Sequence, residues 1–130
     1  MSMKKISFLI MLLVLSACTK KSTPVPVPDA TVIYHFTGST AASYQLRYSG
    51  SDGNPVSTTF TGTTWSKTIT ANKASGFTYA VFFISLTSPA TVITGSADIS
   101  VNGKISSQVP LTFNSGNGST DLTFSAGVFK

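Results

Sequence analysis

Hydrophobic and polar residues alternate with a period of two along several stretches of the chain. Residues 43–49 and 96–101 show this alternation clearly, and residues 64–69 show it more weakly. Such alternation is typical of a β-strand with one buried face. Residues 77–86, in contrast, are apolar at almost every position, which predicts a strand in the middle of a sheet with both faces covered. No stretch keeps the period of a helix, so the pattern predicts β structure alone.

Turn-forming residues separate these stretches at intervals of roughly ten residues. They cluster at residues 51–55, at Asn102-Gly103 and at residues 115–118, and the Asn-Gly pair is suited to a type I′ hairpin. Over residues 31–130 this spacing predicts seven or eight strands. We therefore expect an all-β domain, an immunoglobulin-like antiparallel β-sandwich, with a small β-barrel as the alternative.

The first residues have the pattern of a secretory signal. Lys4 and Lys5 precede the apolar run 8–15, which covers only about half of a hydrocarbon core of roughly 30 Å. The tetrapeptide Leu15–Cys18 then resembles the bacterial lipobox, although an ordinary signal peptide with an incidental cysteine is the alternative. This predicts a lipoprotein signal peptide over residues 1–17 and attachment of fatty acyl chains such as palmitate at Cys18. Two or three chains would hold the protein on a membrane permanently.

Residues 18–30 follow as a predicted tether. Proline at positions 24, 26 and 28 favours an extended polyproline conformation, and twelve residues at that rise reach about 35 Å. The folded domain then begins near Thr31, where the composition changes to 33 Ser and Thr in 100 residues. Cys18 is the only cysteine, so the domain has no disulfide.

Charge adds little information about partners. The chain carries nine Lys and Arg against four Asp, a formal net charge of +5. From residue 31 onward five basic residues stand against three Asp, which leaves +2. The basic residues are isolated and far apart, whereas a nucleic-acid binder would be expected to group them on one face. We therefore expect no nucleic-acid partner.

The chain is poor in residues that carry catalysis or hold metals. His35 is the only imidazole, and a serine with His35 and either Asp98 or Asp121 is a triad that the composition permits. No flanking motif supports that triad, and we expect His35 to face solvent or a sheet edge. One histidine and no spare cysteine leave no metal ligand set. The sequence predicts a protein without cofactor, metal site or catalytic residues, and not an enzyme.

Aromatic residues are the remaining candidates for ligand binding. Trp65, Tyr44 and Tyr48 could stack against the rings of a glycan, since an aromatic face suits the apolar face of a sugar. Alternatively, Trp65 fills the core of the sandwich, which is the interpretation that we prefer.

Several landmarks resemble the MmpS family of small mycobacterial membrane proteins and the related small lipoproteins of Bacteroidota. They span residues 31–110: an opening strand 34–38 that ends in glycine, Tyr44 and Tyr48 before a turn with Gly53, a single Trp65, and a late hairpin 98–104. The chain departs from the family in its lipobox, where relatives have an N-terminal helix, and in Ala97, where a cysteine is frequent. The resemblance implies an immunoglobulin-like sandwich in the cell envelope that acts as accessory to a transporter.

Function and location follow as expectations. We expect a lipid-anchored module of the cell envelope that binds or scaffolds a protein partner without catalysis, and the alternative is a surface lipoprotein that captures glycans. Surface lipoproteins of Bacteroidota resemble one another in an acidic cluster after the lipidated cysteine. Here Lys20 and Lys21 follow Cys18, which predicts an outer-membrane protein facing the periplasm.

Overall fold

The computed structural model describes residues 23, 28–87, 92–114, 116 and 120–129. Within them the chain forms six antiparallel strands and one short 3-10 helix, which confirms the predicted all-β class. The predicted signal peptide, Cys18 and most of the tether lie outside the described residues. In chain order the elements are β1 (Ala30–Ser49), β2 (Pro55–Ala71), η1 (Lys73–Ser75), β3 (Tyr79–Leu86), β4 (Val92–Val101), β5 (Lys104–Asn114) and β6 (Asp121–Gly127).

The long hairpin of β1 and β2 organises the fold. The two strands pair along their whole length except for a shift in register between Thr37 and Ala42, where four residues of β1 lie opposite a single residue of β2. This irregularity bends the strand. As a result the first half of β1 pairs with β4 and the second half pairs with β3. A Cβ atom at Gly95 of β4 would collide with the carbonyl oxygen of Thr37, so glycine permits the close approach at the bend.

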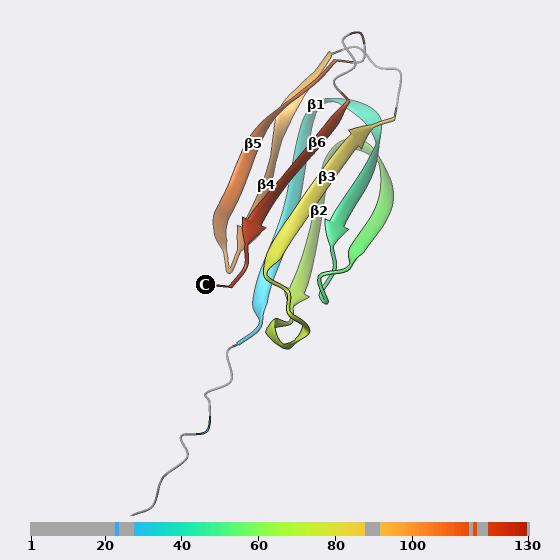
Figure 1. The fold of residues 1–130 in the computed structure, drawn as a ribbon. Coiled ribbons are helices and arrows are strands. Elements are labelled where there is room, and N and C mark those ends of the chain that lie inside the picture. The colour runs from blue at the N-terminus through green and yellow to red at the C-terminus, as the bar shows by residue number, and fades with distance from the viewer. Residues whose placement is uncertain (1–22, 24–27, 88–91, 115, 117–119, 130) are drawn as a thin grey trace, which may run out of the picture.

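The strands follow the order β5-β4-β1-β3-β6, and among the described residues β2 pairs only with β1 (Figure 1). The end strands β5 and β6 come into contact, so the sheet folds over its core into a nearly closed, barrel-like sandwich. The six strands are fewer than the seven or eight expected. The number is lower because β1 and β2 are long, with 20 and 17 residues. Each of them continues through the bend as one strand, where we had expected two shorter strands.

The predicted alternation decides which side chains fill the core. Tyr44, Leu46 and Tyr48 point inward and are buried, as are Ala97 and Ile99 of β4, which confirms both of the clear predictions. The weaker run on β2 is also a strand, in which Trp65 and Ile69 are half-buried against the core. Burying a large apolar side chain contributes about 1.5–3 kcal/mol, so this inward row is a main source of stability.

The prediction for residues 77–86 was wrong in one respect. β3 does lie between β1 and β6, but only its even-numbered residues point into the core. On the outer face Tyr79 is 64% exposed and Val81 is 40% exposed. No described element covers this face. The guanidinium of Arg47 lies 5.8 Å from the centre of the Phe83 ring and shields part of the apolar surface.

Two turns match their sequence signals. Asn102 and Gly103 both have positive φ, 51° and 78°, which confirms the type I′ hairpin between β4 and β5. Asn102 also exchanges hydrogen bonds with the backbone of Thr31, which fastens the hairpin to the start of β1. In the turn after β1, Asp52 accepts hydrogen bonds from the side chain and backbone of Asn54, which lowers the pKa of its carboxyl group.

A buried tyrosine joins the two halves of β1. The Tyr34 hydroxyl donates a 2.8 Å hydrogen bond to the carbonyl oxygen of Ser49. Burial of this side chain raises the pKa of Tyr34 to about 12, because a phenolate would be poorly solvated there. The Ser49 side chain in turn accepts a hydrogen bond from the backbone nitrogen of Val81. These bonds connect the beginning and end of β1 to β3 inside the core.

Candidate functional site

The predicted aromatic candidates do not form an exposed platform. Tyr44 and Tyr48 are buried, and burial raises the pKa of Tyr44. The half-buried Trp65 packs against the core, with its ring centre 5.5 Å from Tyr48 and 5.6 Å from Phe82. Trp65 therefore faces the core from its margin and does not fill it, which differs in part from the interpretation that we preferred. The faces of Tyr44 and Tyr48 are therefore occupied by other side chains and cannot stack on a sugar.

The structure does bring His35 and Asp98 together. His35 Nδ1 lies 3.0 Å from Asp98 Oδ2 across the β1–β4 pairing, and Thr37 Oγ1 lies 3.4 Å from His35 Nε2. Asp121 lies on β6 instead, where it accepts a 2.6 Å hydrogen bond from Ser85. The order hydroxyl, imidazole, carboxylate is that of a hydrolase triad, but the hydroxyl contact is long for proton transfer. The His35 side chain is 38% exposed on the outer face of the sheet, and we assign the pair to cross-strand stabilisation.

Two features, a cluster of metal ligands and a membrane-spanning helix, are absent from the described part of the chain. Its residues contain no group of three or more His, Cys, Asp or Glu side chains placed to hold a metal ion. They also contain no helix that is long and apolar enough to cross a membrane.

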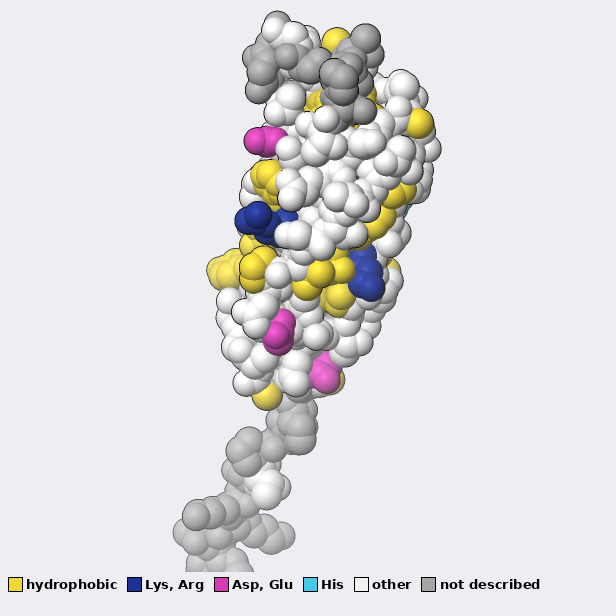
Figure 2. Space-filling view, turned by 90° about the vertical axis from the view of Figure 1, so that its right-hand side faces the viewer, with side chains coloured by type: hydrophobic (Ala, Val, Ile, Leu, Met, Phe, Trp, Pro, Cys, Tyr) yellow, Lys and Arg dark blue, Asp and Glu magenta, His cyan; other side chains and the backbone are white. Residues whose placement is uncertain are grey.

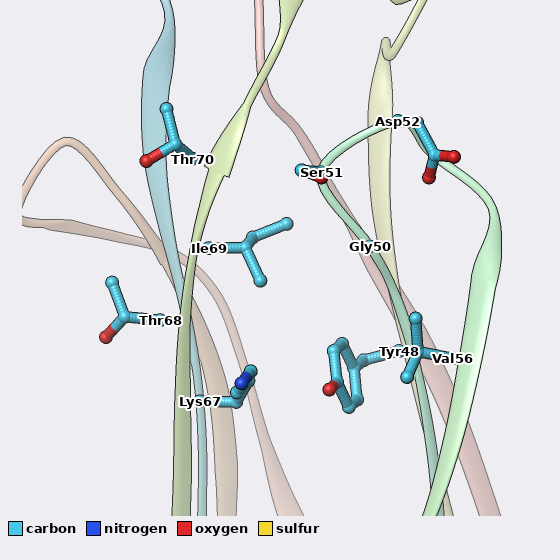
Figure 3. A pocket seen from close by; sticks show the side chains of 9 residues that line it. All are labelled: Tyr48, Gly50, Ser51, Asp52, Val56, Lys67, Thr68, Ile69 and Thr70. Atoms are coloured by element: carbon cyan, nitrogen blue, oxygen red, sulfur yellow. The ribbon is translucent and has the colours of Figure 1, made fainter.

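The bend divides the β1–β2 hairpin into two legs, residues 30–37 with 64–71 and residues 42–49 with 55–62. A cleft of about 410 Å³ opens between these two legs (Figure 3). Lys67 and Ile69 extend into it from one leg, and Tyr48 and Val56 from the other. A hydrogen bond of 3.1 Å from the Asn72 nitrogen to the Ser51 carbonyl oxygen joins the two legs at their ends. The lining residues are Tyr48, Gly50, Ser51, Asp52, Val56, Lys67, Thr68, Ile69 and Thr70.

Two polar groups in the cleft lack partners among the described residues. Lys67 makes no ion pair with any of them. The Tyr48 hydroxyl has no hydrogen-bond partner there, and since no buried polar atom of the described chain is unsatisfied, this hydroxyl must reach solvent. Together with the apolar surface of Val56 and Ile69, the cleft offers an apolar wall beside two hydrogen-bond donors.

The outer edge of β2 forms the rim of this cleft. Within the described residues β2 pairs with β1 alone, so alternate backbone N–H and C=O groups along its 17 residues point away from the sheet. The segment Pro55–Ser66 carries no charge, and Lys67 is the only charged residue of the strand. Figure 2 views the molecule from the side of the β1–β2 hairpin and shows hydrophobic side chains gathered between two groups of basic ones. This edge has little of the charge that usually prevents strand pairing.

Sequence analysis missed both Val56 and Lys67 as site residues. The alternation at residues 64–69 was the available signal, because it placed Lys67 on the same face as Trp65 and Ile69. A lysine in an inward-facing row is a place where the core must open to solvent. Comparison with known proteins found no matching family model and no matching curated protein.

Proposed function

We propose that this protein is a lipid-anchored module of the cell envelope that holds a protein partner by adding a strand of that partner to the outer edge of β2. The observation that carries the proposal is the unpaired, largely uncharged edge of β2 beside an open cleft. In strand addition, backbone hydrogen bonds supply affinity and side-chain pockets along the edge supply specificity. The buried state of Tyr44 and Tyr48 favours this function over glycan stacking.

The anchor and location remain part of the proposal. Lipidation at Cys18 would keep the domain within the tether length of about 35 Å from the membrane. The basic residues after Cys18 support an outer-membrane position on the periplasmic side. The MmpS-like landmarks support a partner embedded in the envelope, such as a transporter. The short tether supports it too, because it would keep the domain close to the membrane.

An added charge on β2 tests the strand-addition function. The substitutions Thr59→Lys and Thr68→Lys place a lysine on exposed positions of the two legs. Gln45→Lys is the matched control: it adds the same charge to the neighbouring position of β1, which has strands on both sides. The lipidated protein, extracted in mild detergent from its own host, should migrate as a complex larger than a single chain, and the β2 variants should migrate as free protein. A complex that survives both β2 substitutions would contradict the proposal.

Glycan capture is a second candidate because the outer face of β3 exposes Tyr79. This ring lies opposite Gly127 of β6, which leaves the neighbouring surface open. Affinity electrophoresis in gels that contain envelope polysaccharides tests this candidate. Retardation that is lost on Tyr79→Ala, with the β2 variants unaffected, would favour glycan capture over strand addition.

A further inference from the structure

The cleft at the rim of β2 has a chemistry of its own. Its apolar part is contributed by Ile69 from one leg of the hairpin and by Val56, which is 39% exposed, from the other. Beside them stand the ammonium group of Lys67 and the hydroxyl of Tyr48. Both groups donate hydrogen bonds, so a carboxylate is their complementary partner.

The geometry of β2 connects this cleft with strand addition. Side chains on β2 alternate, so Lys67 and Ile69 point into the cleft while Thr68 and Thr70 point away from it (Figure 3). A strand added along Lys67–Thr70 would alternate in the same way. Every second side chain of that strand would therefore enter the cleft, and the side chains between them would stay on the outer face.

The charge near the cleft favours an acidic ligand at Lys67. Asp52 also lines the cleft, but its carboxylate is already held by the backbone and side chain of Asn54. Lys67 has no carboxylate partner among the described residues. Lys67 is itself exposed, so a carboxylate on the added strand would form an ion pair there whose strength depends on the salt concentration.

We infer that the cleft selects an extended protein segment in which a large apolar side chain and a carboxylate occupy alternate positions on one face. The carboxylate is that of an aspartate, a glutamate or the C-terminus of the partner. The apolar side chain packs between Val56 and Ile69, and the carboxylate binds Lys67 and the Tyr48 hydroxyl. This inference rests on the proposed strand addition and names the kind of segment that the edge accepts.

Peptide probes of defined sequence test the inference. The first probe is an acetylated, amidated nine-residue peptide that alternates threonine and leucine, with one inward leucine replaced by aspartate. The second carries asparagine in place of the aspartate. Calorimetric titration into the full chain in detergent should show about tenfold tighter binding of the aspartate peptide. Salt should reduce that preference, because it screens the ion pair.

Three variants separate the inference from the proposed function. Lys67→Gln should abolish the preference for aspartate and leave the asparagine peptide bound as before. Lys104→Gln removes the same charge from β5 and should change nothing. Thr68→Lys should weaken both peptides, because it affects the edge but points away from the cleft.

The outcomes are distinct. Equal binding of the two peptides, weakened by Thr68→Lys, would overturn the carboxylate site and leave strand addition standing. Absence of binding by either peptide would overturn both. Displacement of the peptides by laurate, a fatty acid with the same carboxylate, would assign the cleft to a lipid instead of a protein segment. Self-association of the chain that the peptides abolish would assign it to a second copy.

Discussion

Removal of the Tyr34 hydroxyl should destabilise the domain by about 1–3 kcal/mol. Tyr34→Phe keeps the buried ring, which packs on Tyr48 and Phe82, but deletes the donor of the 2.8 Å hydrogen bond to Ser49. A net hydrogen bond contributes about 1 kcal/mol to stability. The loss approaches about 3 kcal/mol when the Ser49 carbonyl oxygen is left buried without another donor. The loss is severe for a domain whose whole stability is about 5–15 kcal/mol.

Urea unfolding of the full chain in detergent measures the effect. With a slope of about 1–3 kcal/mol per molar urea, the midpoint should fall by roughly 1 M at unchanged slope. Tyr48→Phe is the matched control, since its hydroxyl has no partner among the described residues, and it should alter stability by less than about 0.5 kcal/mol. Equal effects of the two substitutions would refute the assignment of the Tyr34 bond as a structural link.

The burial of Tyr34 also predicts a pH dependence, because it disfavours the charged phenolate. The folded protein holds the Tyr34 proton more tightly than the unfolded chain, since the pKa rises from 10.0 to about 12. This contribution is complete below pH 10 and is lost as pH rises toward 12, because the unfolded state releases its proton first. The free energy of unfolding should therefore decline between pH 10 and 12, and Tyr34→Phe should flatten that decline. A decline of equal size in the variant would assign it to other groups.

The remaining predictions concern the indole, the anchor and the location. Trp65→Ala should destabilise the domain by about 2 kcal/mol, less than a fully buried tryptophan would, and the wild-type fluorescence should be moderately blue-shifted; a fully solvent-exposed emission would contradict the packing on Tyr48. Cys18→Ala should leave the protein without fatty-acid label and free of stable membrane attachment; labelling of the variant by an alkyne fatty acid would refute the lipidation. Protease added to intact cells should leave the domain uncut until lysis, and cleavage in intact cells would move it to the surface.

The sequence predicted the strands wherever one face is polar. Alternation at residues 43–49 identified the inward row of β1 because its outer face carries Gln45 and Arg47, which mark the solvent side. The same rule failed on β3, where Val81 and Phe83 lie outside in spite of their apolar character. Local sequence does not report what covers a sheet, and Arg47, distant in sequence, provides the partial cover.

The bend and the site depended on contacts distant in sequence. The roles of Gly38 and Gly95 depend on the pairing of β1 with β4, which brings the two glycines together at the bend of β1. Because of this bend, the two long strands β1 and β2 contribute to both layers of the fold. The His35–Asp98 pair likewise depends on a register that the sequence alone cannot supply. The cleft could not be predicted from the sequence, because it forms only where the two legs of the hairpin diverge and place Tyr48 opposite Ile69.

Hydrogen exchange of β2 in its native membrane is the most direct test of strand addition. The amides of β2 that point away from β1 should exchange slowly in membranes isolated from the host and rapidly in the purified chain, because a partner strand would cover them only in the first case. β5 is the internal control, since it is an edge strand that pairs only with β4 among the described residues, and its exchange should be the same in both samples. Exchange of β2 that does not differ between membrane and purified protein would contradict the account.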